Sequence, residues 1–271
     1  MLGRDPILDI DFGALHKKQC RRASFGARSR ADWDKRAAGR NRAAPTDDYT
    51  RAFLAHIDLT GAQTALDIGC GTGNLAIPLA RRLRTVHALD FSAGMLRNLA
   101  VNRKRAGLKN IVVHRRSWTD SWTGVPTVDI AICSRAMGVL DLRSALGKMN
   151  RKARRRCYVS LHAGGSFLGP DVLTLLDRKL EPRPDYIYAV NILYQMGIRA
   201  KVDFLQSTGG VGYASAEEFI EAVRWRVGAL TLREEVRLQR FCRGLPRAAD
   251  GTMRYRHDFE WALLSWEKSP R

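Results

Sequence analysis

The stretch Asp67–Gly73, which reads Asp-Ile-Gly-Cys-Gly-Thr-Gly, decides the fold of this 271-residue chain. It follows a short apolar run, residues 64–68, that is typical of a buried parallel strand. It precedes residues 74–83, which are apolar at helical spacing. Glycine allows a sharp turn and lets a ligand approach the backbone with no Cβ in the way. The sequence therefore predicts a strand–turn–helix unit whose ligand lies at the carboxyl ends of parallel strands.

The spacing of this turn selects the kind of ligand. The dinucleotide fingerprint is G-x-G-x-x-G, with a pyrophosphate at the helix N-terminus. Here the spacing is G-x-G-x-G, and Asp67 precedes the first glycine. A carboxylate is unfavourable beside a pyrophosphate but suits sulfonium and ammonium groups. Asp90 ends the next predicted strand, 17 residues after Gly73, where it can accept hydrogen bonds from both ribose hydroxyls. We therefore expect a cationic nucleoside.

Strands and helices alternate along most of the chain, which predicts βαβ units and a parallel sheet. Further strands are expected at residues 85–90, 111–114, 128–134, 157–162, 198–204 and 257–266. Helices are expected at residues 92–106, 141–155, 171–180, 186–196 and, as a broken pair, 215–243. The predicted fold is α/β: a doubly wound, mostly parallel, seven-stranded sheet of the Rossmann-like type.

The residue pattern divides the chain into three parts. Residues 1–30 are expected to form a basic irregular arm, and residues 31–60 a helical lid with helices at 32–42 and 46–57. Residues 61–271 are expected to form the ligand-binding domain, with a helical insertion at about 215–245.

The stretches Leu66–Gly73, Ala88–Leu96 and Val128–Ser134 resemble the class I S-adenosylmethionine-dependent methyltransferases. The resemblance implies S-adenosyl-L-methionine as cofactor and S-adenosyl-L-homocysteine as product. It places the turn's glycine backbone against the methionine part of the cofactor and Asp90 at the ribose. The family's acidic residue after the third strand is missing, so Ser117 or Asp120 must replace it at the adenine. The cofactor-binding candidates are Asp67, Gly69, Cys70, Gly71, Gly73, Asp90, Phe91, Met95, Ser117, Trp118 and Ser134.

Methyl transfer from a sulfonium demands alignment and exclusion of water more than it demands a particular side chain. The catalytic candidates therefore rest on position, at the ends of the fourth and fifth strands. Arg135 is a candidate anchor for an anionic substrate, or a member of a surface ion pair. His162 is a candidate base, or a hydrogen-bonded loop histidine. Asp141 is a further candidate, or simply the N-cap of the next helix.

Composition limits the other functional classes. The five cysteines are scattered and never spaced C-x-x-C, so we expect no metal site and a reducing, cytoplasmic location. The sequence contains no run of 18 apolar residues, so we expect no membrane span. The leading hypothesis is a methyltransferase with a small-molecule acceptor. The formal net charge of +19 supports RNA as an alternative substrate, and a non-catalytic cofactor-binding protein is the third hypothesis.

Overall fold

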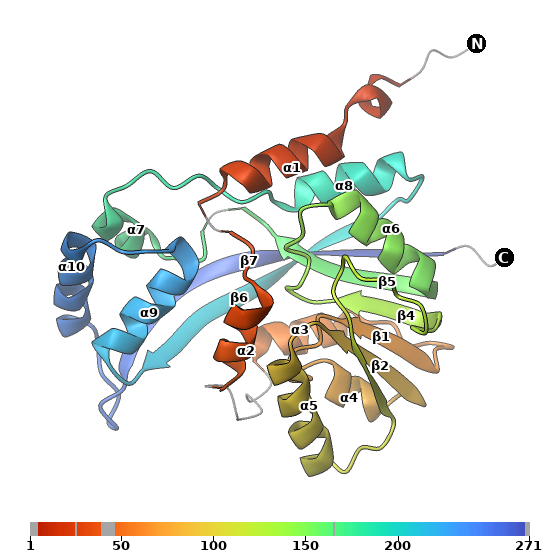
Figure 1. Ribbon diagram of the computed structural model, residues 1–271, viewed down its shortest axis with the longest axis horizontal. Coiled ribbons are helices and arrows are strands. Elements are labelled where there is room, and N and C mark those ends of the chain that lie inside the picture. Colours follow the sequence, from red (N-terminus) through yellow and green to blue (C-terminus); the bar gives the residue numbers. More distant parts are fainter. Residues whose placement is uncertain (1–4, 25, 39–46, 165, 269–271) are drawn as a thin grey trace.

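Five parallel strands form the centre of the computed structural model, which describes residues 5–24, 26–38, 47–164 and 166–268 (Figure 1). The described residues make one seven-stranded sheet in the order β3-β2-β1-β4-β5-β7-β6, with β7 antiparallel to both of its neighbours. The order reverses between β1 and β4, which is the switch point where ligands bind in doubly wound sheets. The strands are β1 (Thr64–Ile68), β2 (Thr85–Asp90), β3 (Ile111–Arg115), β4 (Val128–Cys133), β5 (Ala153–His162), β6 (Lys201–Tyr213) and β7 (Met253–Glu267). This confirms the predicted fold class.

Helices cover both faces of the sheet, which explains why β1 and β4 are buried along their whole length and mostly apolar. Ile130 and Ile132 pack on the side of α3 and α4, whereas Ala131 and Cys133 pack on the side of α6 and α8. The helices are η1 (Pro6–Asp9, a 3₁₀ helix), α1 (Phe12–Arg22), α2 (Arg30–Ala38), α3 (Asp48–Ala55), α4 (Ala76–Ala80), α5 (Ala93–Arg105), α6 (Leu142–Lys152), α7 (Pro170–Leu176), α8 (Tyr186–Gln195), α9 (Ala216–Val227) and α10 (Leu232–Arg243).

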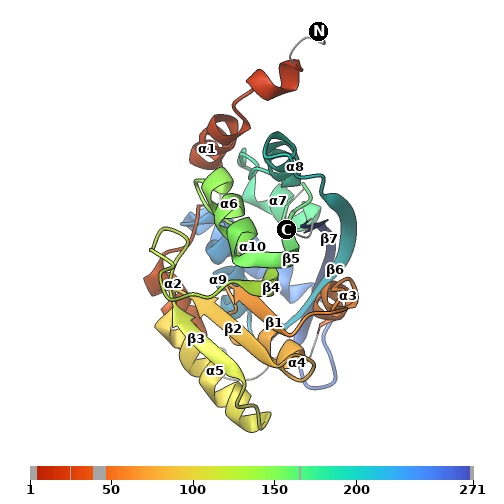
Figure 2. The same cartoon turned by 90° about the vertical axis from the view of Figure 1, so that its right-hand side faces the viewer.

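The expectation of an irregular arm is wrong for residues 12–22, which form α1. Asp11 caps this helix by accepting a hydrogen bond from the N–H of Ala14 at 2.9 Å. His16 is buried and hydrogen-bonds to the carbonyl of Leu140 at 3.3 Å. Figures 1 and 2 place α1 beside α6 and α8. The helix buries only one narrow face. Most of its residues are therefore polar, and the sequence shows no clear apolar repeat at helical spacing. The two lid helices are shorter than expected, and residues 39–46 lie outside the described ranges.

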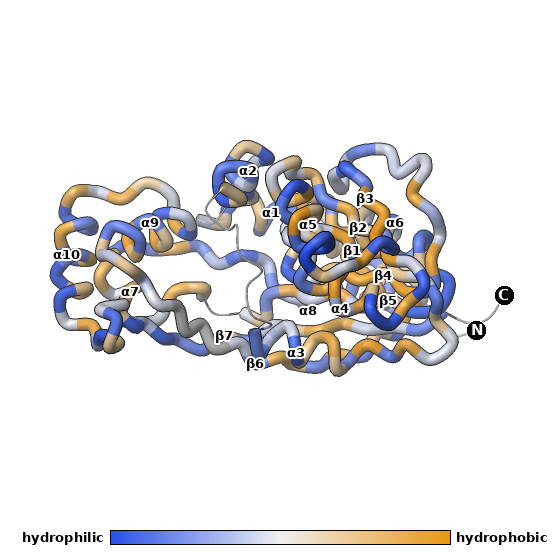
Figure 3. The backbone as a smooth tube through the Cα atoms, turned by 90° about the horizontal axis from the view of Figure 1, so that it is seen from below, coloured by the Kyte–Doolittle hydropathy of each residue, from blue (hydrophilic) through white to orange (hydrophobic). Residues whose placement is uncertain are grey.

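The β6–β7 hairpin is longer than predicted and extends beyond the rest of the sheet. Its strands pair continuously from Lys201–Ser265 to Tyr213–Met253. The expected helical insertion is confirmed as α9 and α10, which connect the two strands. Together with α7 they form a second hydrophobic core, separated from the main one along the hairpin (Figures 1 and 3). Gly209, Gly210 and Gly212 interrupt the apolar pattern of β6, which is why its full length could not be read from the sequence.

We expect the main core to depend strongly on Phe53 of α3, which is fully buried. Phe53→Ala should lower the free energy of unfolding by about 3–5 kcal/mol, because it removes a buried ring and leaves a cavity. The matched control is Phe204→Ala, since Phe204 is 49% exposed and its main ring contact is with Tyr186. This control should cost about 1 kcal/mol. Urea denaturation measures both values, and equal losses would contradict the assignment of α3 to the core.

Candidate functional site

The glycine turn after β1 has the backbone geometry that its sequence predicts. Gly69, Gly71 and Gly73 have φ angles of 72°, 53° and 96°, a region that glycine adopts at little cost. A Cβ on Gly69 would lie 2.2 Å from the Cβ of Ala136, and one on Gly73 would lie 2.4 Å from Cδ1 of Leu99. A Cβ on Gly71 would meet no atom within 4 Å. Gly71 therefore faces open space, where a ligand can approach its backbone.

Backbone hydrogen bonds hold the turn against the end of β2. The N–H groups of Gly69 and Cys70 both donate to the carbonyl of Leu89, at 2.7 and 3.0 Å. The N–H of Gly73 donates to the carbonyl of Cys70 at 2.9 Å. Burial raises the pKa of the Cys70 thiol, with the charges of Asp67 and Asp90 adding to the effect. Cys70 is therefore an inert small residue inside the turn.

Asp90 connects the turn to the next helix. Its Oδ2 accepts a hydrogen bond from the N–H of Gly71 at 2.9 Å, and its Oδ1 accepts one from the N–H of Ser92 at 2.8 Å. Burial raises the pKa of Asp90, and these backbone donors partly offset the rise. Each carboxylate oxygen has two acceptor positions, so both oxygens can still accept a hydrogen bond from a ligand hydroxyl.

Asp67 carries the most informative atom of the site. It is 2% exposed, and its Oδ2 is buried with no hydrogen-bond partner. Burial, together with the nearby Asp90 carboxylate, raises the pKa of Asp67 to about 7. A buried unpaired acceptor costs about 1–3 kcal/mol, and more when it is charged. A cationic ligand beside the turn would offset that cost, so Asp67, Asp90 and the open backbone of Gly71 fit S-adenosylmethionine.

The segment after β3 closes the side where the adenine is expected. The indole Nε1 of Trp118 donates to the carbonyl of Ala136 at 3.0 Å, which ties this segment to the one after β4. The N–H of Ser117 donates to Oδ2 of Asp120 at 2.8 Å, so one oxygen of Asp120 is used within its own turn. Met95 is buried and Phe91 is half-buried at the start of α5.

Asp34 of α2 is a site residue that sequence reasoning missed. Its Oδ1 accepts hydrogen bonds from Oγ of Ser92 at 2.6 Å and from the N–H of Gly94 at 2.8 Å. Its charge adds to the rise in the pKa of Asp90. These contacts hold α2 over the N-terminus of α5, as expected of a lid helix. Asp34 precedes Asp90 by more than fifty residues, and no motif connects them, so only the tertiary structure reveals the pairing.

Beyond β4 a small hydroxyl cluster forms around Tyr49 of α3. The Tyr49 hydroxyl is hydrogen-bonded to Oγ of Ser134 at 2.8 Å and to Oγ of Ser160 at 2.6 Å. The Arg135 guanidinium lies 4.2 Å from the centroid of the Tyr49 ring and pairs with Asp47 at 3.6 Å. Arg135 has a φ of 55°, which is unusual for a residue with a side chain. The ion pair expected as its structural alternative is therefore present.

His162 ends β5 next to this cluster. Its ring centroid lies 4.4 Å from that of Phe167 and 6.3 Å from that of Trp261. Both of its ring nitrogens are buried without a hydrogen-bond partner. Burial, aided by the charge of Arg183, lowers the pKa of His162 to about 4. The imidazole is therefore neutral near pH 7, and its lowered pKa makes it a weak base there.

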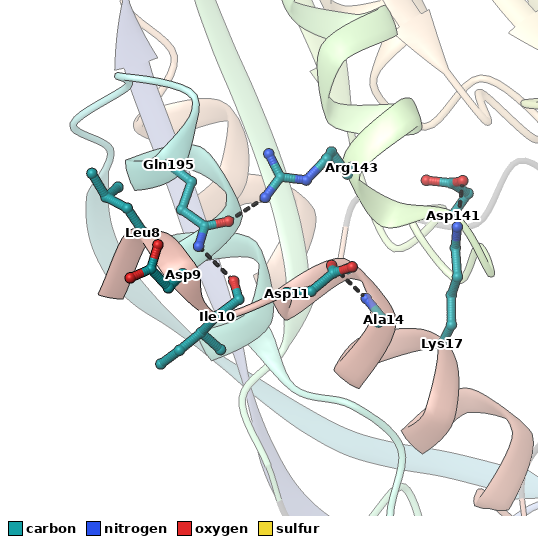
Figure 4. Close-up of a pocket in the computed structure, with 10 residues that line it drawn as sticks. Leu8, Asp9, Ile10, Asp11, Ala14, Lys17, Asp141, Arg143 and Gln195 are labelled. Atoms are coloured by element: carbon teal, nitrogen blue, oxygen red, sulfur yellow. Dashed lines mark hydrogen bonds and ion pairs between the residues drawn. The ribbon is translucent and has the colours of Figure 1, made fainter. Parts of the chain in front are cut away.

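Asp141 lies apart from these residues, and its structural alternative accounts for both of its oxygens. Oδ1 accepts the N–H of Ser144 at 3.0 Å, which caps α6. Oδ2 pairs with Nζ of Lys17 at 2.7 Å. Figure 4 shows Asp141 at the edge of a separate cavity of about 560 Å³ between η1, α1, α6 and α8. The cap is the structural role that the sequence offers as the alternative for Asp141, and the ion pair adds to it.

The sequence predicts neither a metal site nor a membrane span. No group of three or more His, Cys, Asp or Glu side chains within those ranges is placed to hold a metal ion. None of the helices in the described part of the chain is both long enough and apolar enough to cross a membrane.

Comparison with known proteins gives three kinds of similarity. A family model described as "Methyltransferase domain" matches residues 65–156. An uncharacterized protein of Haemophilus influenzae is 31% identical over 263 residues, 96% of this chain and 97% of that protein. A probable cobalt-precorrin-6B C(15)-methyltransferase (decarboxylating) of Methanothermobacter thermautotrophicus is 32% identical over 78 residues, 28% of this chain and 41% of that protein. The crystal structure of the YcgJ protein of Bacillus subtilis aligns with a TM-score of 0.56 at 14% identity, covering 81% of this chain and 97% of that one, which shows a shared fold.

The buried neutral His162 predicts a pH-dependent stability. Its pKa is about 4 in the folded protein and 6.5 by default in the unfolded chain, so the unfolded chain binds more protons between these values. Stability should therefore fall as the pH decreases from about 6.5 to about 4, by up to about 3 kcal/mol from this residue. His162→Gln should flatten this dependence, whereas the exposed control His56→Gln should keep it. Urea denaturation across this pH range measures both, and parallel curves for wild type and His162→Gln would contradict the assignment.

Proposed function

The chain belongs to the class I S-adenosylmethionine-dependent methyltransferases, and from that premise we propose that it methylates a small-molecule acceptor. The observation that carries the proposal is the unpaired buried oxygen of Asp67, which lies beside an open glycine turn and a ribose-binding carboxylate at the switch point of the sheet. A carboxylate kept without a partner in this position serves a cationic ligand.

Each part of the site then has a defined task. The bound cofactor supplies an electrophilic methyl group on a sulfonium with a neutral leaving group. Asp67 and the backbone of Gly71 hold its amino-acid part, and Asp90 holds its ribose. Asp34 fastens α2 over the start of α5, where the lid excludes water from the nucleoside. These contacts fix the direction of the methyl group, which is the main requirement of an in-line displacement.

The acceptor side of the site lies at the ends of β4 and β5. Ser134 and Ser160 are fixed by the Tyr49 hydroxyl, and His162 follows Ser160 by two residues. An acceptor beside these groups would direct a lone pair at the methyl group that bound S-adenosylmethionine would supply. A neutral His162 nitrogen can accept a hydrogen bond from the acceptor and so orient it.

One observation favours a small acceptor over RNA: the residues that line the acceptor side are largely buried. The relatives do not separate the two classes, because 23S rRNA (uracil(1939)-C(5))-methyltransferases match this chain as well as the cobalt-precorrin enzyme does. RNA is kept as the second candidate because of the net charge of +19 and the basic end of α5 (Arg103, Lys104, Arg105).

Asp67→Asn should weaken the binding of S-adenosylmethionine by about 10- to 100-fold, because it removes a charge-assisted contact. With the Asp67 pKa near 7 in the free protein, wild-type affinity should rise as the pH increases from 5.5 to 7.5, because deprotonation produces the binding form. The variant should lose this rise. The control Asp177→Asn, at an exposed position in the second core region, should behave as wild type. Titration calorimetry gives the affinities, and an unchanged affinity for Asp67→Asn would refute the proposed cofactor contact.

The acceptor class is tested with methyl-labelled S-adenosylmethionine and fractionated cell extract, with and without ribonuclease. Label in a low-molecular-weight fraction that survives ribonuclease is the expected result. Label that ribonuclease removes from a large fraction would instead establish RNA as the substrate. Cofactor binding without label in any fraction would favour a non-catalytic cofactor-binding protein.

A further inference from the structure

We infer that one aromatic face of β7 is the acceptor site and that the acceptor is a flat, multi-ring aromatic molecule carrying an anionic group. The inference rests on the proposed methyltransferase function and names its substrate class. This set of buried and half-buried side chains, called here the aromatic row, consists of Tyr255, His257, Phe259 and Trp261 of β7 with the adjoining His162 and Phe167.

The row is a product of strand periodicity. Alternate residues of a strand point to the same face, so the four β7 rings follow one another along the hairpin. Neighbouring ring centroids are 5.9 Å apart for Tyr255 and His257, 5.3 Å for His257 and Phe259, and 6.1 Å for Phe259 and Trp261. At about 3.3 Å per residue the four positions span about 20 Å. This length exceeds a single ring and suits a molecule of several fused or linked rings.

One end of the row reaches the place where the methyl group is expected. The Trp261 ring lies 5.9 Å from the ring of Tyr49, whose hydroxyl bonds to Ser134 after β4. Trp261 is also the β7 partner of His162 at the end of β5. A flat molecule on the row would therefore present its near edge to the Tyr49 hydroxyl cluster and to His162.

Unpaired polar atoms gather on this row. Within the described ranges, six buried side-chain nitrogen and oxygen atoms have no hydrogen-bond partner. One is Oδ2 of Asp67 in the cofactor site, and the other five are both ring nitrogens of His162, both of His257, and Nε1 of Trp261. The backbone of Phe167 raises the pKa of His257. The two groups are nevertheless not close enough or not aligned well enough for a hydrogen bond. Buried polar groups are almost always paired, so this concentration indicates a ligand that supplies the partners.

The charges around the row favour an anion. Arg226 of α9 is half-buried, and its charge helps to lower the pKa of His257, after the effect of burial. Its Nη1 donates to the carbonyl of Ala222, and no carboxylate of the described residues lies within ion-pair distance of it. Two acids also act on His257: Asp171 accepts the Tyr255 hydroxyl at 2.6 Å, and Asp258 pairs with Arg256 at 3.4 Å. A partly buried guanidinium without a carboxylate partner is stabilised by a ligand carboxylate or phosphate.

Burial of the row favours a small molecule over a nucleic acid. Stacking platforms for single strands pair aromatic rings with an open basic groove that follows the backbone. Here Trp261 and His162 are each only 9% exposed and Tyr255 is 8% exposed. A compact aromatic molecule can use such rings through offset or edge-to-face contacts, whereas a polymer backbone needs a longer open path.

The test uses the full chain saturated with S-adenosylhomocysteine and 6-hydroxy-2-naphthoate as the probe. Titration calorimetry should show this probe binding at least about 10-fold more tightly than decalin-2-carboxylate, which lacks the flat rings, and than 2-naphthol, which lacks the charge. Equal affinity for the saturated carboxylate would overturn the inference. Oligouridylate that binds more tightly than the naphthoate and displaces it would also overturn the inference.

Variants separate this inference from the proposed function. Arg226→Gln and His257→Phe should each weaken binding of the naphthoate by about 10-fold, while Arg226→Lys keeps the charge and should lose less. The matched controls Arg240→Gln and His56→Phe should bind as wild type. All variants should bind S-adenosylhomocysteine within about twofold of wild type, which also shows that they are folded. Loss of the naphthoate site alone supports the inference. Unchanged naphthoate binding in both row variants refutes it, and failure of the wild type to bind S-adenosylhomocysteine refutes the proposed function instead.

Discussion

The constraint on which the site depends is the burial of two carboxylates, Asp67 of β1 and Asp90 of β2, beside one glycine turn. Asp90 is stabilised by two backbone N–H donors, one of them from Gly71. Asp67 lacks a partner for one oxygen, and its raised pKa records the cost of keeping it buried. A folded protein tolerates such a cost where function needs it. The open backbone of Gly71 and the position of α2 over the start of α5 both suit a ligand that would pair with this carboxylate.

The β6–β7 hairpin determines the shape of the rest of the molecule. In its inner part it completes the sheet and packs against α3 and α8 on opposite faces. In its outer part the same two strands carry α7, α9 and α10 on their own hydrophobic core (Figure 3). Because strand periodicity continues through both parts, the rings of β7 form an unbroken row from one core to the other. A second core region is thereby brought into line with the carboxyl ends of β4 and β5.

The N-terminal helices connect these two parts of the site. Asp34 of α2 binds the start of α5 on the cofactor side, and Tyr49 of α3 binds Ser134 and Ser160 on the acceptor side. Both helices are short, and the stability of each comes from tertiary packing more than from helix propensity. Their contacts link closure over the cofactor to the arrangement of the acceptor groups.

Local patterns in the sequence were sufficient for the parallel core and the cofactor turn, because strand apolarity, helix caps and a glycine turn act over a few residues. They also placed Arg135 and His162 near the ends of β4 and β5. They failed where the signal was spread thinly or lay far away in the chain: α1 was hidden by its polar composition, and the outer half of β6 by its glycines. The contacts of Asp34, the Tyr49 cluster and the meeting of the β7 rings with His162 exist only once segments fifty to two hundred residues apart have packed together. No local propensity encodes such contacts, so only the tertiary structure decided them.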